Sequence, residues 1–145
     1  MSAYAYLGIA TTVALLSLSP PVLADGDPVA GEKIFARCGV CHGIGETARQ
    51  PGPNLNNVIG RVAGTHPDFA RYSANMREAG EGGLVWTPEK INEYIEAPRK
   101  MIPRGNMAFP GLRNAQERAN VVAYIAQFSE AAENGEDGTE ENGED

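Results

Sequence analysis

Cys38-Gly39-Val40-Cys41-His42 is the stretch around which this chain of 145 residues is organised. Its two thiols are three residues apart, so they share one side of a helical turn, and an imidazole follows at the next position. This spacing is typical of covalent haem attachment, in which each thiol adds to one vinyl group and the histidine binds the iron. The motif predicts one haem c, held by Cys38 and Cys41, with His42 as the proximal ligand.

Two other uses of the cysteines fit the sequence less well. A thioredoxin-like redox pair follows a strand in a βαβ unit, and nothing typical of a strand precedes Cys38. Structural zinc needs four ligands, which would here require both cysteines and the only two histidines, His42 and His66. Because Cys41 and His42 are adjacent, they are poorly placed to reach one tetrahedral ion. Haem attachment is therefore the favoured interpretation.

Charge and hydropathy divide the chain into three parts. Residues 1–24 have no charged side chain, and residues 129–145 have eight acids and no base, although the net charge of the whole chain is -7. An apolar run from Leu7 to Leu18, a Pro20-Pro21 break and small residues up to Ala24 predict a signal peptide at 1–24. Because no Lys or Arg precedes this run, an uncleaved membrane anchor stays an alternative. The acidic tail at 129–145 is predicted to be disordered.

The terminal helices of the middle region are the clearest elements. Asp27-Pro28 predicts a helix start, and Gly31 follows on the same side as Phe35 and Cys38. Residues 116–128 place apolar side chains at helical spacing, namely Val121, Tyr124, Ile125 and Phe128. Glycine weakens a helix, so its presence at position 31 predicts close packing, and we expect the two terminal helices to cross there.

Between the terminal helices we expect an irregular stretch over residues 50–66 and two shorter helices. One would end near Gly80, and the other would run from Thr87-Pro88 to about Ala97, because Pro98 disfavours helical geometry in the preceding residue. Met107 lies between Pro103 and Pro110, in a loop that can cover the haem face opposite His42. From spacing alone the sixth iron ligand stays open among four residues, which are His66, Met76, Met101 and Met107.

Further motifs extend along the same region in order. They are Gly-Pro-Asn-Leu at 52–55, Ile-Gly-Arg-Val-Ala-Gly at 59–64, Tyr72-Ser73, Leu-Val-Trp at 84–86, Tyr94, Ile102-Pro103 and Met107-Ala108-Phe109. With the haem motif, they make residues 25–128 resemble a class I cytochrome c domain, mitochondrial cytochrome c and bacterial cytochrome c2 in particular. The resemblance implies an all-α fold of three to five helices around one covalent haem.

The resemblance also implies roles for single residues. Met107 would be the distal iron ligand, Tyr94 would lie beside its sulfur, and the Pro53 carbonyl would accept the other N–H of His42. The donors to a buried haem propionate would be Arg61, Tyr72 and Trp86. His66 would fall in a surface loop and would not bind the iron. Residues 103–107 depart from the pattern, since they read Pro-Arg-Gly-Asn-Met where the family commonly has Pro-Gly-Thr-Lys-Met.

The function that follows from the resemblance is electron transport, not enzymatic catalysis. We expect a periplasmic, monomeric carrier that shuttles single electrons between a cytochrome bc1-type complex and a terminal oxidase or photosynthetic reaction centre. No nucleic-acid partner is expected. Exposed bases that could steer docking are Lys33, Arg37, Arg99, Lys100 and Arg104. The alternatives are a haem enzyme, a dehydrogenase-associated subunit or a gas-binding protein, all of which need an open or labile iron site.

Overall fold

The computed structural model describes residues 26–47 and 51–129. The predicted signal peptide and the acidic tail beyond residue 129 lie outside these ranges. Five helices occur in the described part of the chain: α1 (Pro28–Gly39), α2 (Ala74–Glu81), α3 (Pro88–Glu96), α4 (Pro98–Met101) and α5 (Ala115–Ala126). One isolated antiparallel bridge joins Val62 to Val85. The all-α class and the expected range of helix number are confirmed.

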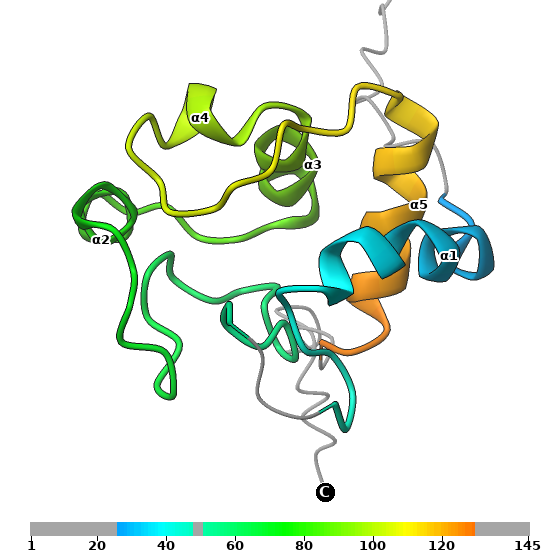
Figure 1. Cartoon of the computed structure of the whole chain (residues 1–145), viewed down its shortest axis with the longest axis horizontal. Helices are drawn as coiled ribbons and strands as arrows, with labels where there is room; N and C mark the ends of the chain where they lie inside the picture. The colour runs from blue at the N-terminus through cyan, green and yellow to red at the C-terminus, as the bar shows by residue number, and fades with distance from the viewer. Residues whose placement is uncertain (1–25, 48–50, 130–145) are drawn as a thin grey trace, which may run out of the picture.

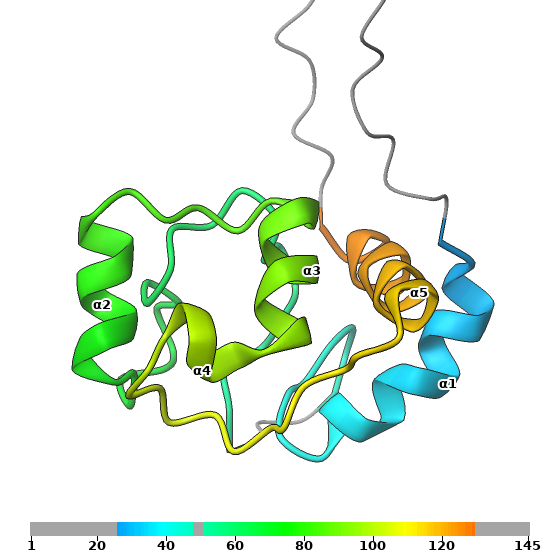
Figure 2. The ribbon, with the colours of Figure 1, turned by 90° about the horizontal axis from the view of Figure 1, so that it is seen from above.

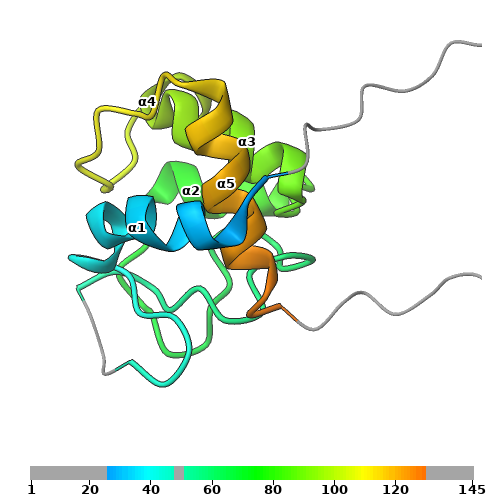
Figure 3. The same ribbon diagram turned by 90° about the vertical axis from the view of Figure 1, so that its right-hand side faces the viewer.

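The crossing of α1 and α5 is the central contact of the fold (Figures 1 and 3). At Gly31 the backbones are so close that a Cβ atom would lie 2.0 Å from the carbonyl oxygen of Asn120. A side chain therefore cannot be accommodated there without moving one helix. The predicted crossing, and its explanation of Gly31, are confirmed.

Apolar and polar contacts both hold the crossing together. The Phe35 ring is 6 % exposed and lies 5.2 Å from the ring of Tyr124, centroid to centroid. Val121 of α5, only 1 % exposed, belongs to the same buried cluster as Phe35. The Asn120 side chain accepts a hydrogen bond of 2.9 Å from the backbone N–H of Asp27, the residue that caps α1. The start of α1 is thus attached directly to the middle of α5.

Two of the shorter helices, α2 and α3, begin at side-chain caps, whereas α4 has no such cap. Ser73 caps α2, which ends at Glu81, one residue beyond the predicted end. Thr87 caps α3, and Ala97 leaves helical geometry with φ -153° before Pro98. The prediction of two short helices was wrong by one, because Pro98 also starts α4. A single helical turn is too short to show a hydrophobic period.

Among the helices of residues 26–47 and 51–129, none combines the length and the apolar character that a membrane span requires.

A buried arginine joins α5 to the rest of the molecule. Arg118 is 8 % exposed and donates hydrogen bonds to the Leu112 and Arg113 carbonyl oxygens at 2.9 and 2.8 Å. It also donates to Asn92 of α3 at 3.1 Å. Since a buried cation is costly without such partners, these contacts fix the end of the long loop between α4 and α5. This loop carries Met107.

Replacing Gly31 tests the close crossing. We expect Gly31→Val to lower the free energy of unfolding by about 1–3 kcal/mol, because its side chain overpacks the contact with α5. The measurement is guanidinium chloride unfolding of the haem-loaded protein, followed by circular dichroism. Gly39→Ala is the control, since a Cβ there would lie 3.9 Å from the Phe35 ring, an ordinary contact distance. Equal stabilities of the two variants would contradict the packing argument.

Candidate haem site

The haem motif lies at the end of α1, where the helix turns into a loop. The backbone N–H groups of Cys41 and His42 both donate to the Cys38 carbonyl oxygen, each at 2.9 Å. Both thiols are free, Cys38 half-buried and Cys41 exposed. Burial raises the pKa of the Cys38 thiol, and the neighbouring Arg37 charge opposes this shift. The turn therefore presents two thiols and one imidazole within a single short stretch.

The imidazole of His42 is oriented by a backbone carbonyl. Its Nδ1–H donates a 2.8 Å hydrogen bond to the Pro53 oxygen, so Nε2 is left available to a metal ion. Burial lowers the pKa of His42, and the bond to Pro53 offsets part of this effect. The ring is therefore neutral at pH 7, the state in which imidazole binds a metal. The hydrogen bond expected from the sequence is present.

Gly52 allows the Pro53 loop to reach the imidazole. A Cβ at this position would lie 2.7 Å from the Cys41 carbonyl oxygen and 2.9 Å from Cε1 of His42. The Gly52 N–H also donates to the Cys41 carbonyl at 2.7 Å. Sequence reasoning assigned no role to Gly52, although a glycine directly before Pro53 was a signal of close backbone approach.

Arg61 and Tyr72, two of the predicted propionate partners, contact one another. Burial lowers the pKa of Arg61 and raises that of Tyr72, while the hydrogen bond and the attraction between the two groups oppose both shifts. The Arg61 guanidinium also donates to the carbonyl oxygens of Asn54 (3.1 Å) and Asn56. It is thereby fixed to the loop that holds Pro53. The two asparagine carbonyls were not foreseen, because any residue type supplies a carbonyl.

Trp86 and Tyr94 complete the group of predicted side chains. The backbone of Trp86 pairs with its neighbours at residues 60–61, with N–H to Arg61 O at 2.9 Å. Its ring lies 5.0 Å from the ring of Tyr94, and both residues are buried. Burial raises the pKa of Tyr94 to about 12, so its phenol remains protonated and can donate a hydrogen bond at neutral pH. The predicted propionate partners are thus close together, and Tyr94 lies next to them.

Met107 lies in the loop between α4 and α5, where it is partly buried against the core. The Arg37 guanidinium, adjacent to Cys38, lies 6.0 Å from the ring centroid of Phe109. This contact brings the Met107 loop beside the haem motif. Met76 and Met101 are also partly buried against the core, so burial does not select among the methionines. His66 accepts a 3.1 Å hydrogen bond from the Asp68 N–H, within its own loop.

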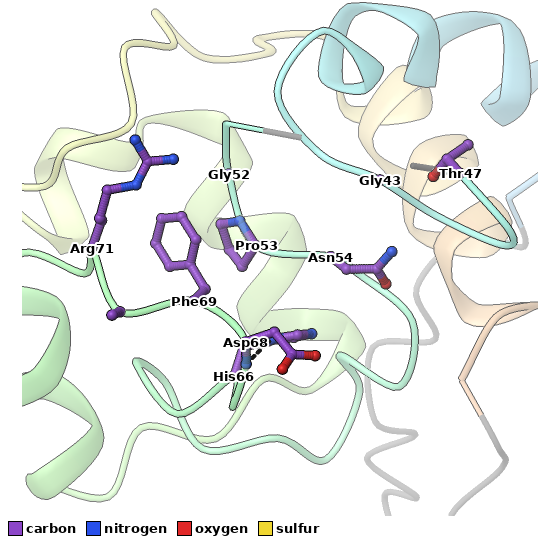
Figure 4. Close-up of a pocket in the computed structure, with 10 residues that line it drawn as sticks. Gly43, Thr47, Gly52, Pro53, Asn54, His66, Asp68, Phe69 and Arg71 are labelled. Carbon is purple, nitrogen blue, oxygen red and sulfur yellow. Dashed lines mark hydrogen bonds between the residues drawn. The ribbon is translucent and has the colours of Figure 1, made fainter. Parts of the chain in front are cut away.

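A separate pocket lies between the loops at 43–54 and 66–71 (Figure 4). Phe69 faces Pro53 across it, and Arg71, which also lines it, donates a 2.7 Å hydrogen bond to the Pro51 carbonyl. Cys38, Cys41, His42 and Met107 are not among the residues that line this pocket. It shares Pro53 with the candidate haem site but is not the place where the thiols and the imidazole meet.

The residues present fit a haem c in four respects. Two free thiols suit the two vinyl groups, and a neutral imidazole with Nε2 available suits the iron. The Arg61–Tyr72 pair can neutralise a propionate. Buried aromatic rings, those of Trp86 and Tyr94, supply an apolar wall.

Known proteins support the same assignment. Residues 28–129 match the family model described as Cytochrome c. A cytochrome c2 of Agrobacterium tumefaciens is 46% identical over 102 residues, which are 70% of this chain and 91% of that protein. A cytochrome c2 of Afifella marina is 48% identical over 105 residues, 71% of this chain and 84% of the relative.

The structural likeness agrees with the sequence likeness. The solved structure of cytochrome c2 from Rhodospirillum centenum superposes with a TM-score of 0.65 and 43% identity, covering 72% of this chain and all of that one. The family-model match at residues 28–129 spans every described helix of the present fold. The chain therefore belongs to the cytochrome c family, electron-carrying proteins with one covalently bound haem c.

Proposed function

We propose that this protein carries single electrons from a cytochrome bc1-type complex to a terminal oxidase or a photosynthetic reaction centre. The observation that carries the proposal is the pairing of a fixed imidazole with a thioether-bearing loop beside it. His42 is held by the Pro53 carbonyl at 2.8 Å, and the Met107 loop approaches the end of α1 through Phe109 and Arg37. If the imidazole and the thioether both bind the iron, the site is closed and six-coordinate. Such a site suits an electron carrier better than an enzyme, which needs an open position for its substrate.

The proposed ligand set assigns one task to each residue. Cys38 and Cys41 form the thioether links, and His42 and Met107 bind the iron. Haem iron supplies a one-electron couple, and a thioether ligand favours its reduced state. Because the turn after α1 and the Pro53 carbonyl hold His42 in one orientation, the protein has little to rearrange when the charge changes.

Arg61, Tyr72 and Trp86 are proposed to hold a haem propionate. The Arg61 guanidinium is anchored by carbonyl oxygens from one side and contacts the phenol of Tyr72 from another. A half-buried cation with a neighbouring hydroxyl is a suitable partner for a carboxylate removed from bulk water. Tyr94, with its protonated phenol, is proposed to lie beside the Met107 sulfur.

Partner docking is proposed at the surface around the haem motif. The five candidate bases, Lys33, Arg37, Arg99, Lys100 and Arg104, are all exposed. Val40, inside the motif, is 71 % exposed beside exposed Cys41. An apolar spot near bases suits a transient complex with an acidic partner surface, because long-range charge steers the encounter while the small contact area permits rapid release.

We further propose that residues 1–24 are an export signal, that residues 25–128 form the cytochrome c domain, and that 129–145 remain a disordered tail. The product would be a periplasmic monomer, with a membrane-anchored form if the signal is retained. The apolar run of the leader, its small residues at 22–24 and the acidic composition of the tail support this organisation.

Replacing Met107 tests the ligand set. We expect Met107→Ala to lose the long-wavelength methionine–iron absorption of the ferric protein, to bind carbon monoxide in the ferrous form, and to lower the reduction potential by on the order of 0.1 V. Met76→Leu and Met101→Leu are matched controls that should keep all three properties. Retention of the absorption band in Met107→Ala would show that another residue binds the iron.

Salt and charge reversal test the docking surface. With a purified bc1-type complex as donor, reduction of the carrier should slow at high ionic strength. At low ionic strength, Lys100→Glu should slow it by roughly threefold to tenfold. Lys90→Glu is the control, since Lys90 is on α3 and pairs with Glu93 at 2.8 Å. A rate that does not depend on salt, or equal effects of both reversals, would exclude steering at this surface.

Intact mass measurement of the exported protein tests attachment and processing together. We expect a chain that begins at Asp25 and carries one haem. The Cys38→Ala/Cys41→Ala double variant should lose the covalent haem, because no other cysteine exists to replace the links. A mass that includes Met1 would show that the leader is retained, and a haem-free mass for the unmodified chain would contradict attachment.

A further inference from the structure

The loop that carries Met107 receives little support from its own backbone. The Gly105 N–H donates to Ile102 O at 3.0 Å, and the next such bond along the chain is from Leu112 N–H to Ile95 O at 2.8 Å. Within the described residues, the backbone–backbone hydrogen bonds include none from residues 106–111. The position of Met107 therefore depends on side chains next to it.

Two of these side chains connect the loop to the beginning of α2. Arg104 Nε donates to Asn75 Oδ1 at 3.0 Å, and Asn106 Nδ2 donates to the Arg71 carbonyl oxygen at 3.0 Å. Figure 2 shows the segment after α4 passing the first turn of α2. Because the partners are 29 and 35 residues away in sequence, both bonds are tertiary contacts, not features of the loop itself.

The acceptor of the first bond is itself oriented. Asn75 Nδ2 donates to Glu78 Oε2 at 2.8 Å, which directs Oδ1 toward Arg104. The amide thus lies between a guanidinium and a carboxylate, an arrangement in which charge strengthens both hydrogen bonds. The contact has a defined geometry although all of its members are near the surface.

The other side of the loop has separate anchors. The Phe109 ring contacts the Arg37 guanidinium of α1 at 6.0 Å. Gly111 adopts a positive φ of 105°, and a Cβ there would lie 2.1 Å from the Glu96 carbonyl oxygen. Met107 is therefore placed between a contact to α1 and α3 on one side and a contact to α2 on the other.

We propose that the Arg104–Asn75 and Asn106–Arg71 hydrogen bonds form a latch that holds Met107 in place over the haem. The inference rests on the proposed function, in which Met107 is the distal ligand. Arg104 and Asn106 are positioning residues, which act through the loop and not on the haem. They stand where the family commonly has glycine and lysine, so the departure from the pattern supplies the latch.

The latch determines how easily an outside ligand replaces Met107. For replacement, the loop must move away from α2, and both hydrogen bonds must break. Removing one bond should raise the fraction of open loop by roughly threefold to tenfold, the factor that corresponds to one ordinary hydrogen bond. The apparent affinity for a competing ligand rises by the same factor, because that ligand binds only the open form.

Imidazole titration of the ferric, haem-loaded protein measures this opening directly. Arg104→Ala, Asn75→Ala and Asn106→Ala should each bind imidazole roughly threefold to tenfold more tightly than the unmodified chain. The Arg104→Ala/Asn75→Ala double variant should bind no more tightly than either single variant, because the two residues share one bond. Asn106→Lys, which restores a donor, should recover much of the original resistance.

Controls separate the latch from general effects of charge and stability. Arg113→Ala removes an exposed charge from the far end of the same loop. It should leave imidazole binding unchanged, because Arg113 contacts Arg118 through its backbone carbonyl and not through its side chain. The midpoint of global unfolding in guanidinium chloride should also stay close to that of the unmodified protein, because the latch bonds are exposed. Tighter imidazole binding that merely followed a loss of global stability would overturn the proposal.

The two hypotheses fail in different ways. If the unmodified ferric protein lacks the methionine–iron absorption, or Met107→Ala retains it, the ligand assignment fails. If that absorption behaves as expected but the three latch variants bind imidazole like the unmodified chain, the latch alone is wrong. Additive effects of Arg104→Ala and Asn75→Ala would likewise overturn the direct contact between them.

Discussion

The contact of Gly31 with the backbone of Asn120 is the constraint on which the rest of the structure depends. It lets α1 and α5 approach so closely that a side chain at position 31 would overlap a carbonyl oxygen. Because the haem motif is the last turn of α1 and its continuation, this crossing places both thiols and His42 relative to the core. The same α5 fixes the end of the Met107 loop through Arg118. One helix pair thereby positions the haem motif and one end of the loop that carries Met107.

Around this pair, side chains that donate to backbone carbonyls hold the irregular segments, together with backbone–backbone hydrogen bonds. His42 bonds to Pro53, Arg61 to Asn54 and Asn56, and Asn106 to Arg71. Where a loop carbonyl has no backbone donor, a side-chain donor satisfies it and helps to set the position of the loop. These bonds position the loops on either side of the candidate haem site.

Much of this could be predicted, because the relevant signals are short in range. The Asp27-Pro28 and Thr87-Pro88 starts, the Pro98 stop and the apolar stripe of α5 were read correctly, since each depends on neighbouring residues. Helix α4 was missed because one turn carries no period. The partners of Arg61 and Arg104 were missed because a carbonyl or amide far away in the sequence leaves no pattern. The resemblance to class I cytochrome c named Pro53, whose carbonyl no residue-type argument could have selected.

The sequence by itself determined the chemistry of attachment, since Cys38, Cys41 and His42 are within five consecutive residues and their spacing alone suits a haem c. It also determined the class of fold and the family. Only the tertiary structure decided how His42 is oriented, which residues surround Arg61, and what holds the loop of Met107. The physical reason is distance along the chain: the contacts that place these groups join residues such as Asn106 and Arg71, which are 35 positions apart, or Arg37 and Phe109, which are farther apart still, and they exist only once the helices have packed.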